Sequence, residues 1–258
     1  MQLDVRHGVV LPPGGGEALF DGRIVIKAGF EQLSITETLY PQARDGASAH
    51  FHRRHADTFY VLEGELAVLI GDEEVLLAPG ACACVPPGLV HGFRSTTRAR
   101  FLNFHTPDGD FAENLRARDR GEPGGFDSFD PPSDIDSDVA EAIVLGPSEG
   151  ERLEAHERIA TIKVGRPELA FVEFDLAPGF AGPDPHTHDD HVDSFYVLSG
   201  EPEFLVGDAR HRLGGGSFVA APIGAVHAFG NPGPERARLL NVHAPSGGFH
   251  DGLMRPVA

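Results

Sequence analysis

The sequence contains one long pattern twice. The segment HFHRRHADTFYVLEGE, which starts at His50, returns as HTHDDHVDSFYVLSGE, which starts at His186. The shared register continues to a later histidine in each copy, His91 in the first and His227 in the second. A repeat of this length indicates that each copy folds into a similar unit, and 258 residues suffice for two domains of ordinary size. The sequence therefore predicts two related domains in tandem.

The segment between the two copies has the composition of a linker. Residues 119–138 read DRGEPGGFDSFDPPSDIDSD and are rich in Gly, Pro, Asp and Ser. We therefore expect a first domain at residues 1–118, a linker at 119–138 and a second domain at 139–258. Immediately before the linker, residues 110–118 (DFAENLRAR) contain good helix formers, which predicts one short helix at the end of the first domain.

Outside that helix, the apolar segments are short. They are rich in β-branched or aromatic residues, and Gly or Pro separates them. In the first copy, the predicted strands are residues 33–40, 58–62, 66–70, 75–77 and 101–104. Many short strands at this spacing predict an all-β chain built from barrels or sandwiches.

The chain is acidic, with a formal net charge of -18. This charge repels phosphate backbones and anionic membrane surfaces, and no cluster of Lys and Arg offsets it, so we expect neither nucleic acid nor a membrane as a partner. No stretch of about 18 apolar residues is present, and the first residues lack a secretory signal pattern, which predicts a cytoplasmic location. Cys82 and Cys84 fit such a location as reduced, buried side chains.

Each copy of the repeat carries three histidines and one aspartate at equivalent positions. Two of the histidines are separated by one residue, so on an extended strand they project from the same face. The third follows a Pro-x-Gly turn that can bring it back toward that pair. Three imidazoles and one acid suit one divalent Fe, Mn, Ni, Cu or Zn ion per domain, and ligand type alone does not choose among these metals. The predicted ligands are His50, His52, Asp57 and His91 in the first copy and His186, His188, Asp193 and His227 in the second.

At these positions, the sequence resembles the two motifs of the cupin superfamily. The first motif pairs HXH with a following acid and glycine, and the second places PXG before a histidine and an asparagine. The second copy carries both motifs at His186, His188, Asp193, Gly200, Gly216, Pro222, Gly224, His227 and Asn231. Because the two copies cover nearly the whole chain, it resembles a bicupin. The resemblance implies two tandem double-stranded β-helix (jelly-roll) barrels.

The sequence departs from the family pattern in three ways. Asp57 and Asp193 stand where the family usually has Glu, Ser95 replaces the asparagine of the second motif in the first copy, and the leading glycine of the motif is displaced in both copies. Because aspartate is one methylene shorter than glutamate, it either ligates the metal or lies just outside a set of three histidines and water. Both arrangements occur at catalytic metal sites.

Within the family, the length and motif pattern resemble quercetin dioxygenases and their relatives. This resemblance implies a dioxygenase acting on a small aromatic or enolic substrate, with oxygen and substrate meeting at the metal. Asp57 or Asp193 would then accept the proton of a substrate hydroxyl. Two alternatives stay open: a metal-dependent isomerase, lyase or decarboxylase, and a non-catalytic cupin that binds a small molecule. Bicupins are often oligomeric, so a homo-oligomer is a further expectation from the resemblance.

Several other polar residues are expected near the sites rather than among the ligands. His55 and His191 lie three residues beyond the histidine pair, in the turn before the next strand. Buried or pocket-lining polar groups are expected at Asn103, His105, Asn241 and His243. A phosphosugar substrate would require a basic pocket, for which the sequence offers only Arg53, Arg54, Arg98 and Arg100 as weak candidates. No role is assigned to His7, His156, His211 and His250.

Overall fold

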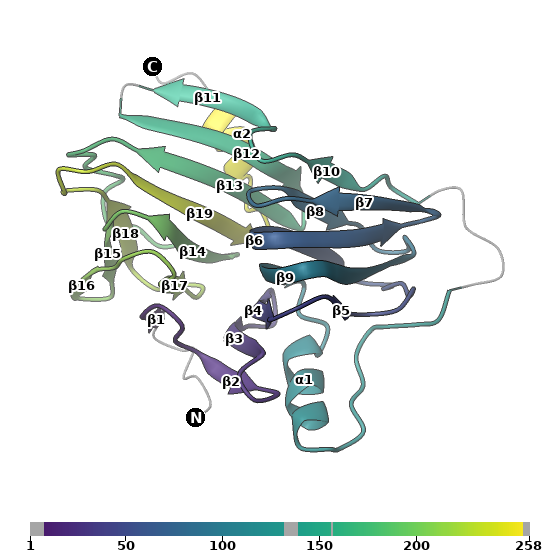
Figure 1. Cartoon of the computed structure of the whole chain (residues 1–258). Coiled ribbons are helices and arrows are strands. Elements are labelled where there is room, and N and C mark those ends of the chain that lie inside the picture. The colour runs from purple at the N-terminus through teal and green to yellow at the C-terminus, as the bar shows by residue number, and fades with distance from the viewer. Residues whose placement is uncertain (1–7, 132–138, 156, 255–258) are drawn as a thin grey trace. The chain divides into compact units, whose positions relative to one another are not determined.

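A computed structural model describes residues 8–131, 139–155 and 157–254 (Figure 1). The chain forms two compact units, one made of Met1–Glu17 with Gly150–Ala258 and the other of Ala18–Glu149. Both units are antiparallel and consist mostly of strands, which confirms the predicted all-β class with two barrels. Within the described ranges, no helix is long and apolar enough to cross a membrane.

The unit made of Ala18–Glu149 holds the first copy of the repeat. Its main sheet has the order β10-β8-β6-β9-β4-β3-β2, with β5 added to β9 and β7 added to β6. One helix, α1 (Phe111–Asp119), follows the last strand of the first copy, as the sequence predicts. The strands are β2 (Glu17–Leu19), β3 (Ile24–Gly29), β4 (Ser34–Tyr40), β5 (Arg44–Asp45), β6 (Ala56–Ile70), β7 (Glu73–Leu77), β8 (Cys82–Val85), β9 (His91–Thr106) and β10 (Ile143–Leu145).

Strand β6 joins two segments that the sequence separates. Residues 58–62 and 66–70 were expected as two strands because Gly64 lies between them. In the structure, Gly64 sits at an irregularity where β6 stays paired with β9. Its φ is 74°, and a Cβ at this position would lie 1.7 Å from the carbonyl oxygen of Arg98. Glycine is therefore required here because it lets one long strand bend without losing its partner.

The other unit holds the second copy. Its strands form a seven-stranded sheet, β1-β17-β14-β19-β13-β12-β11, and a three-stranded sheet, β16-β15-β18. A second short helix, α2 (Phe249–Met254), follows the last strand and was not predicted. The strands are β1 (Val9–Leu11), β11 (Glu151–Ala155), β12 (Arg158–Arg166), β13 (Leu169–Leu176), β14 (Val192–Ser199), β15 (Glu203–Val206), β16 (Ala209–Arg212), β17 (Phe218–Ala221), β18 (His227–Gly230) and β19 (Ala237–Ala244).

The unit boundaries differ from the expected division at 118 and 139. Strand β1, near the start of the chain, pairs with β17 of the second copy, and β10, which follows the expected linker, pairs with β8 of the first copy. Each of these strands covers the edge of a sheet whose other strands come from the opposite half of the sequence. Composition and local pattern contain no signal for such pairing, so the sequence assigned both strands to the wrong unit. Residues 132–138 of the expected linker lie outside the described residues.

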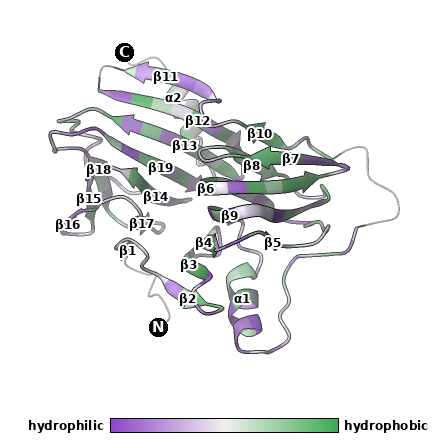
Figure 2. Cartoon of the chain, in the orientation of Figure 1, coloured by the Kyte–Doolittle hydropathy of each residue, from purple (hydrophilic) through white to green (hydrophobic). Residues whose placement is uncertain are grey.

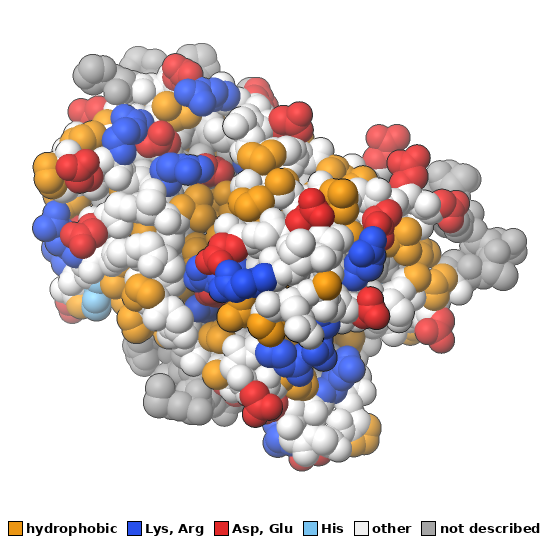
Figure 3. All heavy atoms as spheres, in the orientation of Figure 1, with side chains coloured by type: hydrophobic (Ala, Val, Ile, Leu, Met, Phe, Trp, Pro, Cys, Tyr) orange, Lys and Arg blue, Asp and Glu red, His pale blue; other side chains and the backbone are white. Residues whose placement is uncertain are grey.

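Apolar side chains fill each unit. Figure 2 shows β8 and β10 as largely hydrophobic, and on β8 both Cys82 and Cys84 are buried, as predicted. On the face drawn in Figure 3, Lys and Arg side chains lie in small groups beside Asp and Glu. The ion pairs of Arg94 with Glu74 and of Arg98 with Glu63 illustrate this surface pairing.

Candidate metal centres

The first centre brings together the four predicted ligands of the first copy. His50, His52, Asp57 and His91 offer ligand atoms that all lie within 4.8 Å of one another. His50 and His52 come from the segment before β6, Asp57 lies on β6, and His91 begins β9. Two backbone hydrogen bonds of 2.8 Å join His50 and His91 to each other, so the first and the last imidazole are held side by side.

The tautomer of each imidazole in the first centre follows from its neighbours. The Nδ1 atoms of His50 and His91 lie 2.8 and 2.9 Å from the backbone oxygens of Ser48 and Leu89, and His52 Nδ1 lies 2.5 Å from the backbone oxygen of Asp127. A carbonyl only accepts, so each Nδ1 carries the hydrogen and each Nε2 keeps its lone pair. His52 Nε2 is buried and has no hydrogen-bond partner. Three lone pairs aimed at one point fit a divalent metal ion.

The second centre repeats this construction with His186, His188 and His227, whose ligand atoms also lie within 4.8 Å of one another. His186 Nδ1 and His227 Nδ1 lie 2.8 and 2.9 Å from the backbone oxygens of Asp184 and Ala225. Backbone hydrogen bonds of 3.0 and 2.9 Å join His186 and His227. His188 Nε2 is buried without a partner, like its counterpart in the first centre. The donor set therefore fits a metal in this unit as well.

The two aspartates lie against the histidines in slightly different ways. Asp57 Oδ2 is 3.3 Å from His91 Nε2 and 4.0 Å from His52 Nε2. Asp193 Oδ2 is 3.1 Å from His227 Nε2 and 3.9 Å from His188 Nε2, but it does not belong to the group within 4.8 Å. Direct ligation by either carboxylate stays a prediction.

Charge in the centres follows from burial and from these contacts. Burial lowers the pKa of His52 to about 3 and that of His188 to about 4. Burial also opposes ionisation of Asp57 and Asp193, yet the surrounding histidines lower the pKa of each carboxyl. In the second centre, burial alone would lower the pKa of His227, but its hydrogen bond to Asp193 raises it. His52 and His188 are therefore held neutral, the state in which an imidazole binds a divalent cation, whereas the raised pKa of His227 means that metal binding there must displace a proton.

A second layer of histidines lies behind each centre. The ring of His55 stacks on His52 at a centroid distance of 3.9 Å, and His191 stacks on His188 at the same distance. The late-strand histidines are each covered by a phenylalanine from the following helix, with His105 on Phe111 at 3.7 Å and His243 on Phe249 at 3.8 Å. The expectation that these residues lie near the sites agrees with this geometry. His7 and His156 lie outside the described residues.

Sequence reasoning missed Asp127, which falls in the expected linker. Its side chain is buried and accepts hydrogen bonds from the backbone N–H groups of Arg53 at 3.1 Å and Arg54 at 2.6 Å. The same carboxylate lies 3.2 Å from His55 Nδ1. Residues 119–131 therefore include part of the wall of the first centre. The sequence held one weak signal, namely the phenylalanines of FDSFD within an otherwise polar segment.

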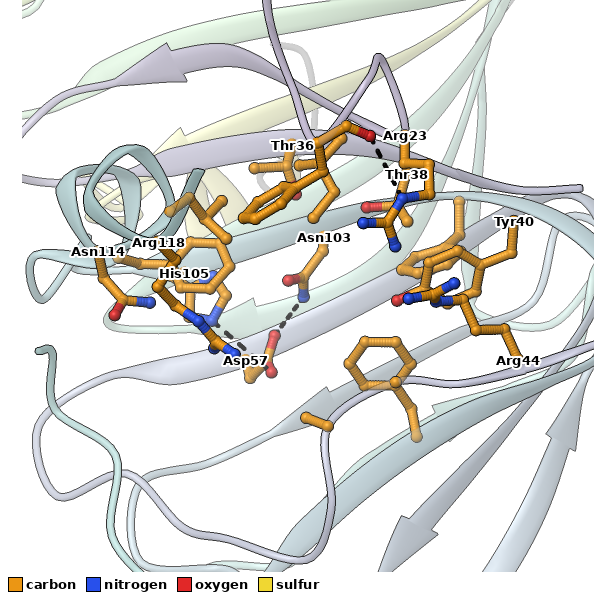
Figure 4. A pocket seen from close by; sticks show the side chains of 18 of the residues that line it. Arg23, Thr36, Thr38, Tyr40, Arg44, Asp57, Asn103, His105, Asn114 and Arg118 are labelled. Carbon is orange, nitrogen blue, oxygen red and sulfur yellow. Dashed lines mark hydrogen bonds and ion pairs between the residues drawn. The ribbon is translucent and has the colours of Figure 1, made fainter. Parts of the chain in front are cut away.

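A cavity of about 280 Å³ lies beside the first centre (Figure 4). Asp57 and Asn103 lie in the middle of the view, with Arg23 and Arg44 toward Tyr40 and Arg118 toward His105. The arginines expected as weak pocket candidates do not line it. Arg53 lies over the ring of Phe129, Arg54 lies 3.7 Å from Asp127, and Arg98 and Arg100 pair with Glu63. That expectation is corrected, since these residues face carboxylates or an aromatic ring outside the cavity.

A second hollow, of about 520 Å³, adjoins the first cavity. The two share Gly46, Ala47, His50, Arg118 and Phe126 as lining residues, and the second is otherwise formed by residues 48–49 and 128–130. The cavity beside the first centre therefore continues toward the outside past a candidate ligand, His50.

Comparisons with known proteins identify the repeated unit. The Cupin domain family matches residues 36–105 and again residues 172–243. The chain is 34% identical over 91 residues to quercetin 2,3-dioxygenase of Bacillus subtilis, a match covering 33% of this chain and 27% of that protein. It therefore spans only about a quarter of that relative. Oxalate decarboxylase of the same organism superposes with a TM-score of 0.53 at 20% identity, covering 83% of this chain and 68% of the other. AerE from Microcystis aeruginosa superposes with a TM-score of 0.62 at 13% identity, covering 92% and 98%. These two structural likenesses concern the fold alone.

Proposed function

The chain belongs to the cupin family, with two tandem cupin domains, and from this premise we propose that it is a metal-dependent dioxygenase acting on a small aromatic or enolic substrate. The single observation that carries the proposal is the first centre, where three imidazole lone pairs and a carboxylate meet beside a cavity. The proposed ligands are His50, His52, Asp57 and His91 there and His186, His188, Asp193 and His227 in the second centre.

The metal, when bound, would supply a Lewis acid for oxygen-bearing ligands, and an Fe, Mn, Ni or Cu ion, unlike Zn, would also supply redox chemistry. Divalent Fe, Mn, Ni, Cu and Zn all suit the donor set. The protein's own task is to hold three neutral imidazoles in place through hydrogen bonds from Nδ1 to backbone carbonyls. A preformed metal site requires ligand side chains whose orientation is fixed in this way.

Asp57 is the proposed general base of the first domain. Its carboxylate lines the cavity as well as the centre, and its lowered pKa keeps it ionised. A carboxylate in this position can accept the proton of a substrate hydroxyl as the oxygen binds. Asp193 is the equivalent group of the second domain. The likeness to quercetin 2,3-dioxygenase supports an oxygen-dependent reaction.

A metal-dependent decarboxylase is the second candidate. The observation in its favour is the presence of Arg23, Arg44 and Arg118 among the residues lining the cavity. Guanidinium groups recognise carboxylates by paired hydrogen bonds. In that reaction, the metal would serve as a Lewis acid that polarises a carbonyl group.

Elemental analysis combined with oxygen uptake tests the proposal. Protein purified without added metal should contain close to two transition-metal ions per chain, and it should consume oxygen with some member of a flavonol and catechol panel. Turnover of a carboxylic acid without oxygen would favour the decarboxylase. Protein that holds no transition metal after growth in iron, nickel and manganese would contradict both enzymatic proposals.

A further inference from the structure

The two centres are alike, but the space beside them is not. Strands β4 and β13 are equivalent, because Thr36 lies opposite Asn103 in one domain and Val172 lies opposite Asn241 in the other. The same register places Thr38 opposite Phe101 and Phe174 opposite Leu239. Side chains on this face can therefore be compared position by position.

In the first domain, this face of β4 borders a cavity. Thr36, Thr38 and Tyr40 all line it. Each of these side chains carries a hydroxyl group, and each is buried. A row of hydroxyl groups in the cavity that Asp57 also lines makes the wall partly polar, which suits a substrate with oxygen atoms of its own.

In the second domain, apolar side chains fill the equivalent positions. Val172, Phe174 and Leu176 replace the three hydroxyl-bearing residues, and each is 0% exposed within the apolar core of that domain. Two of the arginine positions change in the same way. Ile159 takes the place of Arg23. Phe180 takes the place of Arg44, because Phe180 pairs with Asn231 and Arg44 pairs with the equivalent residue, Ser95. Phe180 packs against the same apolar core. At these described positions, the polar wall of the first cavity is therefore replaced by apolar core in the second domain.

The arginines of the first cavity are free to bind an anion. Within the described ranges, none of Arg23, Arg44 and Arg118 forms an ion pair with a carboxylate. Arg23 Nε donates to the backbone oxygen of Phe20 at 3.3 Å, and the Arg44 guanidinium lies over the ring of Tyr40 at 5.7 Å. Both contacts orient a guanidinium group without neutralising it. The carboxylates that line the cavity are Asp45, which is exposed, and Asp57.

We infer that substrate binds in the first domain alone, and that it is a small ring compound carrying a carboxylate, which Arg23, Arg44 and Arg118 recognise. This inference rests on the proposed function for the statement that the first centre is catalytic. The volume of about 280 Å³ lies just below the range of roughly 300–1,000 Å³ for pockets that hold drug-sized ligands, so a single ring fits. Phe93, Phe101, Phe111 and Phe126 provide apolar walls for that ring. Among the described residues, the second domain keeps the histidines of a candidate metal centre, but apolar side chains take the place of the three hydroxyl-bearing residues and of two of the arginines that line the first cavity.

Binding of benzoate and benzamide to the metal-loaded protein tests the inference independently of turnover. The two probes have nearly the same shape, and only benzoate is charged. Ligand-observed NMR and calorimetry should show one benzoate site per chain and at least about tenfold weaker binding of benzamide. Arg44→Gln and Arg118→Gln, both at exposed positions, should each weaken benzoate binding about three- to tenfold, with benzamide unaffected. Arg94→Gln, at an exposed arginine outside the cavity, is the matched control and should change neither.

Filling the cavity is the second arm of the experiment. Thr38→Phe introduces the side chain that Phe174 has in the second domain, and it should abolish binding of both probes while the metal content stays that of the unaltered protein. Thr38→Val removes the hydroxyl group but leaves the space, so it should bind benzoate within about threefold of the unaltered protein. Two benzoate sites per chain, or benzoate binding that survives Thr38→Phe, would overturn the assignment to one domain. Equal affinity for benzoate and benzamide would overturn the substrate class.

The two proposals fail in different ways. One benzoate site that depends on the arginines, in a protein without oxygen uptake or decarboxylation, would refute the proposed function and leave the anion site standing. Oxygen uptake with neutral substrates, in a protein that does not prefer benzoate to benzamide, would refute the anion site and leave the proposed function standing.

Discussion

The side-chain amide of Asn103 donates a hydrogen bond to Oδ1 of Asp57. The contact crosses from β9 to the neighbouring β6, and it leaves Oδ2 of the carboxylate facing the Nε2 atoms of the histidines. The second domain has the same pair, with Asn241 donating to Asp193 at 2.5 Å. An amide donor stabilises the charged form of a carboxylate and fixes its orientation. The repeat of this pair indicates that one oxygen of the acid is held in place while the other faces the centre.

Replacement of this donor should impair turnover without removing the metal. Asn103→Leu deletes a hydrogen bond to a charged group, a contact whose loss costs about 1.5–3 kcal/mol, so we expect turnover to fall roughly ten- to a hundredfold. The pKa of Asp57 should rise, because its ionised form loses a donor, and the acid limb of the pH–rate profile should move to higher pH. Steady-state kinetics across pH, with metal content measured on the same samples, checks both effects.

Asn241→Leu is the matched control for that experiment. It removes the equivalent donor from Asp193 in the domain where apolar side chains replace the hydroxyl-bearing residues of the cavity wall. If substrate binds in the first domain only, turnover should stay within about twofold of the unaltered protein. An equal loss of turnover in both variants would show that both domains are catalytic.

Removal of one imidazole should empty one centre at a time. His52→Ala and His188→Ala each delete a candidate metal-ligand atom, Nε2, that is buried and has no hydrogen-bond partner. We expect each variant to bind one metal ion fewer per chain, since three donors from the protein are needed for a stable catalytic site. Elemental analysis measures the loss. His211→Ala, at a histidine outside both centres, should leave the metal content unchanged, and a folded His188→Ala protein with full metal content would contradict the proposed ligand set.

The folding consequences of those variants should be small. The stability of a barrel comes mainly from apolar burial, and the core of the second domain is built from residues such as Phe174 and Leu239 rather than from the centre. Circular dichroism of His188→Ala should match that of the unaltered protein. Collapse of the fold on removal of His188 would show that the metal has a structural role.

The repeated residues could be identified from sequence because the repeat marks them twice. The three histidines and the aspartate of each copy follow from spacing that chance does not produce, and the cupin architecture follows from the resemblance of those residues to the cupin motifs. Even the short helix α1 at Phe111–Asp119 was visible in local composition. Each of these features is marked either by adjacent residues or by the internal repeat. Both kinds of signal can be recognised in a single sequence.

The missed features are those that occur in only one copy or depend on distant pairing. Arg23, Arg44 and Arg118 line the cavity, but nothing in their local sequence distinguishes them from arginines that pair with Glu at the surface. Asp127 belongs to a segment with the composition of a linker. The exchange of β1 and β10 between units results from edge pairing over long separations, which alternation of apolar residues does not encode.

Asp127 should matter to the first centre only. Asp127→Ala leaves the backbone N–H groups of Arg53 and Arg54 without their acceptor and removes the carboxylate beside His55. We expect the free energy of unfolding to fall by about 2 kcal/mol. Metal affinity of the first centre should fall as well, because the lost side-chain contacts hold in place the backbone of residue 127, whose oxygen accepts from His52 Nδ1.

The metal effect is measured most cleanly in the His188→Ala background, where the first centre is the proposed remaining site. Metal content should then drop from near one ion per chain toward zero at limiting metal. Asp130→Ala, at an exposed aspartate three residues further along, is the control and should retain its metal. Full retention of metal by the Asp127→Ala double variant would show that residues 119–131 do not support the centre.

The metal-free protein should lose stability as the pH falls below neutrality. Burial lowers the pKa of His52 from 6.5 to about 3 and those of His188 and His243 to about 4. Below about pH 6.5, the unfolded chain therefore binds protons that the folded chain does not, and each such group lowers the free energy of unfolding by up to about 1.4 kcal/mol per pH unit. His227 acts in the opposite sense because its pKa is raised. Burial also lowers the pKa of His50, His55 and His105, so the lowered groups outnumber His227 and the melting temperature should fall steadily from about pH 7 to about pH 4.5. Scanning calorimetry of chelator-treated protein measures this fall, and His52→Gln should reduce its slope. A melting temperature that stays constant or rises over this range would contradict the burial of neutral imidazoles at both centres.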